Sequence, residues 1–133
     1  MKMSNVLPDR IQLRRVRGYK MPPRTRVCDR RTDYGNPFVV GKRFNNLGLW
    51  IAINGVMTQA EIKLWFEDDG FLVRDAAHAV ELFRKYVEWR VNKCADGRTL
   101  LAELLHYEHL GCFCARDASC HVDVWLEMLK ELE

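Results

Sequence analysis

A short apolar run at residues 110–114 (LGCFC) lies between two expected helices, and it constrains the fold more than any other feature of the chain. One helix is expected over about residues 99–107, and another begins near Ser119 or Cys120. The second helix carries one apolar face, formed by Val122, Trp125, Leu126, Leu129 and Leu132. Because a strand without polar alternation is usually buried on both faces, residues 110–114 are predicted to be an inner strand of an α/β sheet.

Other strands are expected nearer the N-terminus. Residues 11–16 and 26–28 have strand character, and the Pro22-Pro23 pair between them excludes a continuous helix. Residues 49–53 (LWIAI) are also predicted to be β-like, because the Asn54-Gly55 pair that follows is typical of a hairpin turn.

Two further helices have clear start patterns. Thr58 followed by Glu61 forms the pattern of a capping box and predicts a helix through about Glu67. From Asp75 to about Asn92, apolar side chains recur every three or four residues, which predicts an amphipathic helix. With 133 residues and 48% hydrophobic composition, we expect a single compact Rossmann-like α/β domain over residues 1–133. It would have two or three layers, a small, partly parallel sheet and about four helices.

Charge is distributed unevenly along the chain. Residues 1–43 carry 12 basic and 3 acidic side chains, a net +9, whereas residues 44–133 carry 9 and 15, a net −6. A basic segment suits an anionic partner such as a nucleotide or nucleic acid, or it packs on the acidic body of its own chain. No apolar run is long enough to span a membrane and no secretory signal is recognisable, so a cytoplasmic location without membrane contact is expected.

Five cysteines, an odd number without a secretory signal, predict reduced thiols. Cys112, Cys114, Cys120 and His121 can converge, because the first two share one face of the predicted strand. Zinc is the candidate cofactor, since thiolate and imidazole are its preferred ligands. The alternative is that Cys112 and Cys114 are small buried apolar residues.

A second interpretation of this segment is catalytic. Cys120 at a helix N-terminus is expected to have a lowered pKa, with His121 or Asp123 beside it for acid–base work. The same helix N-terminus can bind a phosphate or carboxylate.

A second candidate site is the turn around residues 34–38 (YGNPF), which Gly35 and Pro37 make rigid. Arginine side chains just before it suit capture of phosphate or carboxylate, and Asn36 offers donors and acceptors for a base or ribose. The alternative is a structural turn whose Phe38 fills the core. The candidate ligand-binding residues are Arg30, Arg31, Asp33, Gly35, Asn36, Pro37 and Phe38.

Cations also line the chain from Arg10 to Arg26, and they suit contact with a phosphate backbone. Only Tyr19 supplies an aromatic ring among them, so general binding of single-stranded nucleic acid is possible but not indicated by the sequence.

Three motifs together resemble a known family. They are R-x-x-x-Y-G-N-P-F at residues 30–38, A-V-E-L-F at 79–83 and L-x-C-x-C-x5-C-H-x-D at 110–123, and their combination is similar to domain of unknown function 4326. Members of that family are small proteins of bacteriophages and bacteria. The resemblance covers nearly the whole chain, with Tyr34 and Phe113 where tryptophan is frequent and Val122 where a small residue is usual.

The family name implies no activity, so the functional hypotheses come from the site residues. The preferred one is a phage-type cytoplasmic domain that binds, and processes, a phosphorylated nucleotide or nucleoside. In it Arg30 and Arg31 hold the anion with the helix N-terminus, and Cys120, His121 and Asp123 supply chemistry. The alternative is a non-enzymatic, zinc-stabilised module that binds nucleic acid or a host protein.

Overall fold

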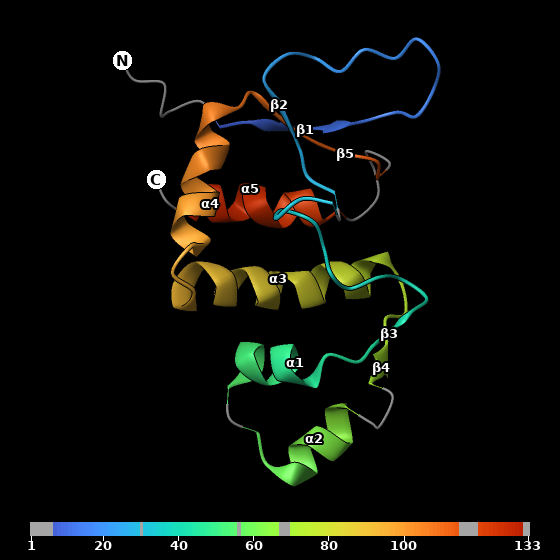
Figure 1. The fold of residues 1–133 in the computed structure, drawn as a ribbon, viewed down its shortest axis with the longest axis vertical. Helices are drawn as coiled ribbons and strands as arrows, with labels where there is room; N and C mark the ends of the chain where they lie inside the picture. Colours follow the sequence, from blue (N-terminus) through green and yellow to red (C-terminus); the bar gives the residue numbers. More distant parts are fainter. Residues whose placement is uncertain (1–6, 30, 56, 67–69, 115–119, 132–133) are drawn as a thin grey trace.

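Three parallel strands form the sheet that organises the site. The structure, a computed structural model, describes residues 7–29, 31–55, 57–66, 70–114 and 120–131. Strand β5 (His109–Cys112) lies in the centre, with β1 (Asp9–Gln12) on one side and β2 (Thr25–Val27) on the other (Figure 1). The α/β class and an inner strand in the apolar run are therefore confirmed, but the strand covers residues 109–112 and not the whole of 110–114.

The first strand is shorter than residues 11–16 and begins earlier. The backbone hydrogen bonds between β1 and β5 end with the one from the Leu13 N–H to the Cys112 carbonyl, at 2.7 Å. Leu13 is buried and packs against Gly111, where an added β-carbon would approach its side chain to 2.9 Å. Because β5 offers only four residues to the ladder, the chain beyond Leu13 has no strand to pair with and leaves the sheet.

Five α-helices are present among the described residues, against about four expected. The predicted amphipathic helix is α3 (Ala76–Lys93), with Asp75 as its N-cap accepting from the His78 N–H at 2.8 Å. Helix α2 (Gln59–Trp65) begins with the predicted Thr58–Glu61 capping box. Helix α4 (Gly97–Glu103) continues into a 3₁₀ turn, η2 (Leu104–His106), and α5 (His121–Glu131) follows β5.

The strand expected at residues 49–53 is wrong, because this segment is helical. It forms α1 (Leu47–Asn54), whose N-cap Asn46 accepts a hydrogen bond from the Leu49 N–H at 3.0 Å. The Asn54-Gly55 pair ends this helix instead of turning a hairpin. Gly55 has φ +83° and donates its N–H to the Ile51 carbonyl, as glycine commonly does after a helix.

Helix α3 separates two apolar clusters. On one side it packs with α4, α5 and the sheet around Trp125, and on the other with α1 and the small β3 (Arg43–Phe44) and β4 (Phe71–Leu72) pair around Phe44. Figure 1 shows this stacking, with the parallel sheet at one end and α2 at the other. None of the described helices has both the length and the apolar character needed to cross a bilayer.

Candidate functional site

A pocket of about 430 Å³ lies at the carboxyl ends of the parallel strands. One wall follows the strand ends, and the other comes from the 36–40 turn and the start of α3. The strand-end wall is formed by Arg15, Asp29, Arg31, Cys112, Phe113, Cys114 and His121, and the opposite wall by Asn36, Phe38, Val40, Ala76, Ala79 and Val80. Ligands of open α/β sheets bind at this edge, and the volume lies in the range of small-molecule pockets.

The structure thus brings together the two segments that sequence singled out, residues 31–38 and 112–121. Of the predicted residues, Arg31, Asn36, Phe38, Cys112, Cys114 and His121 line this pocket. Asp33, Gly35 and Pro37 line a different hollow, of about 350 Å³, beside Tyr86 and Arg90. Arg30 and the 115–119 loop lie outside the described residues.

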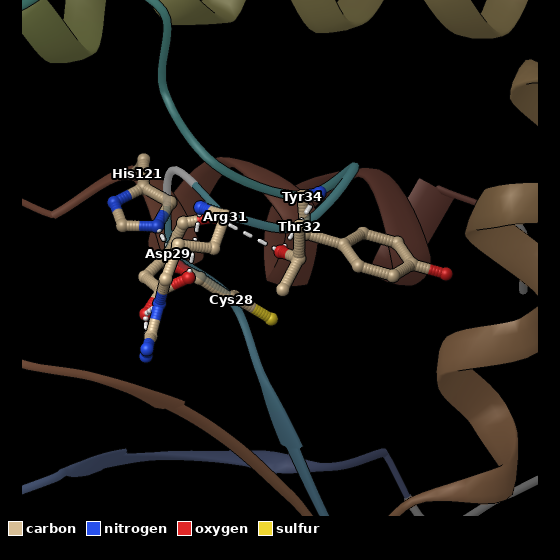
Figure 2. Close-up of polar contacts among 6 residues, drawn as sticks. All are labelled: Cys28, Asp29, Arg31, Thr32, Tyr34 and His121. Carbon is tan, nitrogen blue, oxygen red and sulfur yellow. Dashed lines mark hydrogen bonds and ion pairs between the residues drawn. The ribbon is translucent and has the colours of Figure 1, made fainter.

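Arg31 is held at the pocket mouth by Asp29 (Figure 2). Its Nη2 lies 2.6 Å and its Nε 3.0 Å from Asp29 Oδ2, and its backbone N–H donates to Oδ1 at 3.0 Å. The hydrogen bond from the Arg31 side chain is the main reason that the pKa of Asp29 is lowered. The guanidinium remains largely exposed, at 76% of its side-chain area, so a ligand anion can reach it.

The turn that carries Asn36 is fixed to the core by its own polar groups. The buried Asn36 donates from Nδ2 to the Ala79 carbonyl at 3.1 Å and accepts from the Phe38 N–H at 2.8 Å. Tyr34, which points away from His121 in Figure 2, donates to the Leu100 carbonyl at 2.8 Å. Asn36 therefore holds the turn against α3, and Phe38 is fully buried in the core as the structural alternative predicts.

Three thiols meet beside the pocket, and two of them, Cys112 and Cys114, line it. The sulfur atoms of Cys112, Cys114 and Cys120 all lie within 4.8 Å of one another, and those of Cys112 and Cys120 are 2.9 Å apart as free thiols. Three thiol groups at this separation can hold a metal ion.

Negative charge in this cluster is favoured on Cys114 and not on Cys120. Hydrogen bonds from Cys112, Cys120 and His121 lower the pKa of Cys114. The pKa of Cys120 is raised by its hydrogen bonds with Cys112 and Cys114 and by burial. The lowered pKa expected for Cys120 at the helix N-terminus is therefore wrong, because the neighbouring sulfurs outweigh the helix end.

His121 is oriented by the end of β2. Its Nε2 contacts the carbonyl oxygen of Cys28 at hydrogen-bond range, and its ring packs edge-on against Phe83 with centroids 5.7 Å apart. A carbonyl only accepts hydrogen bonds, so Nε2 carries a proton. Nδ1 lies 3.8 Å from the Cys120 sulfur, so the other ring nitrogen of His121 faces the thiols.

Asp123 is turned away from this arrangement. It pairs with Arg10, whose Nη1 lies 2.9 Å from its Oδ2, and it is not among the residues that line the pocket. The Arg10 side chain is only 12% exposed and lies close enough to Cys120 and Cys112 for their charge to affect its pKa. Arg10 therefore supplies a buried positive charge beside the thiol cluster.

Seven residues of the pocket lining were not among the predicted site residues, and three of them, Asp29, Phe113 and Arg15, belong to the strand-end wall. Phe113 directly follows β5 and Asp29 comes two residues after β2, and such a position at the strand ends is a pattern that the sequence contains. Arg15 reaches the pocket from the 13–24 loop and places its guanidinium over the Phe113 ring, 3.8 Å from the centroid. That contact joins segments about 100 residues apart and has no local sequence pattern.

Comparison with known proteins adds a family but no activity. A family model described as Domain of unknown function (DUF4326) matches residues 11–131. Neither the curated proteins nor the solved structures gave a significant match. The matched range contains β2, β5, all five helices and every residue of the pocket described above. The chain therefore belongs to the DUF4326 family of domains of unknown function.

Proposed function

We propose that this protein binds a small phosphate-bearing ligand of the nucleotide or nucleoside class in the pocket at the strand ends. The observation that carries the proposal is the meeting of Arg15, Arg31 and His121 around one cavity. Arginine forks suit the bidentate recognition of phosphate oxygens. Asp29 holds Arg31 in place through an ion pair. A more highly charged phosphate would replace Asp29 as the ion-pair partner of Arg31.

The opposite wall supports a ligand that also has a flat, weakly polar part. Val40, Ala79 and Val80 line that wall, and the Phe113 ring lies on the arginine side. Arginine-stacked aromatic rings are common platforms for bases. A ligand with a phosphate at one end and a base at the other matches this division of the pocket.

For processing of the bound ligand, we propose Cys114 and His121 as the acting groups. Both line the pocket, whereas Cys120 is buried behind them and Asp123 is paired with Arg10. In this assignment Cys120 and Asp123 position their neighbours.

Titration calorimetry with nucleoside monophosphates, nucleosides and inorganic phosphate tests the binding proposal. We expect a nucleoside monophosphate to bind, and Arg15→Ala and Arg31→Ala each to weaken binding about tenfold, roughly 1.4 kcal/mol. Arg98→Ala is the matched control, because Arg98 is an exposed cation on α4. No binding by any probe, or equal affinity in the Arg15/Arg31 double variant, would overturn the proposal.

The second candidate function is a zinc-stabilised module that binds nucleic acid or a host protein. The three clustered thiols favour it, and so does His121, whose Nε2–H is fixed by the Cys28 carbonyl. Zinc-ligating histidines usually donate their other N–H to such an oxygen. Cys112, Cys114, Cys120 and His121 would hold the ion, and Arg10 would offset the negative charge of three thiolates.

Metal analysis of protein purified without chelator tests this candidate. We expect one zinc per chain in the wild type and in Cys94→Ser, and loss of zinc in Cys114→Ser. Cys94 is the control because it is the free cysteine of α3's C-terminal end, outside the cluster. Absence of stoichiometric metal, with a melting temperature indifferent to EDTA, would remove the zinc candidate.

A further inference from the structure

The loop between β1 and β2, residues 13–24, is a basic and largely exposed segment that the site leaves unexplained. From Arg10 to Cys28 the chain has seven cationic side chains and no acidic one. Arg14, Arg17 and Lys20 are exposed, and among the described residues no ion pair or hydrogen bond engages their side chains. Their charge is therefore available to a partner.

Both ends of this loop are anchored, so the cations are held in a defined place. At one end Leu13 is buried against Gly111. At the other, Arg24 has φ +59°, its carbonyl accepts from the Glu108 and His109 N–H groups at 2.9 and 3.2 Å, and its guanidinium pairs with Glu108 at 3.0 Å. A non-glycine residue in this left-handed conformation persists only where its surroundings hold it.

The loop also leads directly into the pocket. Arg15 belongs to the loop and to the pocket wall at once, through its contact with Phe113. In Figure 1 the loop leaves β1 beyond the end of β5 and then runs back over the sheet to the start of β2. Beside the cations the loop exposes two apolar side chains, Val16 at 58% and Met21 at 46%.

We infer that the 13–24 loop is a docking surface for single-stranded nucleic acid, whose terminal nucleotide enters the pocket. This inference rests on the proposed function, and it names the substrate as an oligonucleotide end. The cations contact successive phosphates, and Val16 and Met21 give bases an apolar surface. An anionic membrane would use the same charge and apolar tips, but its headgroups lack the flat, weakly polar base that suits the wall formed by Val40, Ala79 and Val80.

Fluorescence anisotropy with labelled ten-nucleotide dT and U strands, over a series of salt concentrations, tests the inference. Three phosphate contacts predict that Arg14→Ala/Arg17→Ala/Lys20→Ala flattens the slope of log affinity against log salt by about 2. Lys63→Ala/Lys85→Ala/Arg98→Ala removes the same charge from exposed positions on α2, α3 and α4 and should leave the slope unchanged. Circular dichroism checks that both triple variants remain folded.

Each alternative outcome decides against the inference in a recognisable way. Absence of oligonucleotide binding at low salt overturns it, as does an equal loss in the two triple variants, which would reflect net charge alone. Stronger binding to vesicles containing phosphatidylserine than to either strand would assign the loop to a membrane instead. If a mononucleotide binds while the strands do not, the pocket proposal stands and this inference fails. If the strands bind through the loop but Arg31→Ala has no effect on any probe, the pocket proposal fails.

Discussion

His121 donates its Nε2–H to the carbonyl oxygen of Cys28, a residue 93 positions earlier in the chain. This contact ties the first residue of α5 to the residue that follows β2. It brings the two halves of the pocket wall together and sets which imidazole nitrogen faces the thiols.

We predict that His121 is in the Nε2–H tautomer in the metal-free protein. Long-range ¹H–¹⁵N correlation spectra of the imidazole rings measure this directly. His106, which is exposed, serves as the reference and should show averaging between tautomers. An unprotonated Nε2 on His121 would contradict the hydrogen bond to Cys28.

Asn36→Ala should destabilise the fold by about 2–4 kcal/mol, measured by urea unfolding. The substitution leaves the Ala79 carbonyl and the Phe38 N–H without their buried side-chain partner. Asn92→Ala, an exposed change on α3, should alter the free energy of unfolding by less than about 0.5 kcal/mol. Equal effects of the two variants would show that the 34–38 turn does not depend on Asn36.

Gly97→Ala and Gly48→Ala are expected to have opposite effects. A β-carbon on Gly97 would lie 1.8 Å from the Arg90 carbonyl oxygen, so α4 would have to move away from α3, at a cost of about 2 kcal/mol or more. At Gly48 the nearest atom would be Asn46 Oδ1, at 3.6 Å, and alanine should stabilise α1 by about 0.5–1 kcal/mol. Thermal unfolding compares the two, and a neutral Gly97→Ala would disprove the close helix contact.

Asp96→Asn should lower stability at neutral pH, with an effect that disappears in acid. The hydrogen bond from Arg90 is the main cause of the lowered pKa of Asp96. A carboxyl whose folded pKa is depressed stabilises the fold above its unfolded pKa, and that contribution is lost as pH falls through the folded value. Urea midpoints of the two proteins should therefore converge progressively below about pH 4, and a constant difference would exclude this origin.

Cys28 should resist alkylation in the folded protein, whereas Cys94 should react. Cys28 is 0% exposed, and burial is the main reason that its pKa is raised to about 12. Cys94 is partly exposed after the end of α3. Iodoacetamide followed by peptide mass spectrometry should find Cys28 modified only in denaturant. Native labelling of Cys28 at the rate of Cys94 would contradict the packing.

Sequence predicted the elements whose determinants are local. The Thr58–Glu61 capping box and the periodic run after Asp75 specify their helices within one or two turns of chain, and both are present. The prediction of a strand at residues 49–53 was wrong because a short apolar, β-branched run does not distinguish a strand from a helix. The N-cap at Asn46 favours the helix that the structure shows. The end of β1 was not predictable from its own residues, because the length of β5 sets it.

The site was predictable in its two segments but not in its connections. The 31–38 and 112–121 segments were both identified, and the strand-end position of the second followed from its pattern. The engagement of Asn36 with Ala79, the pairing of Asp123 with Arg10 and the contact of Arg15 with Phe113 all join distant parts of the chain. Such contacts depend on how the helices pack on the sheet, and a local sequence pattern does not predict this packing.

The central position of β5 also determines when the fold can form. Strands β1 and β2 do not pair with each other, and both pair with β5. The paired residues Asp9 and His109 are 100 positions apart in the chain, and Thr25 and His109 are 84 apart. Closing loops of that length before any ladder forms slows folding. During synthesis the basic segment around β1 and β2 must therefore leave the ribosome long before its strands find β5, and the pocket is completed only once β5 and the start of α5 have emerged.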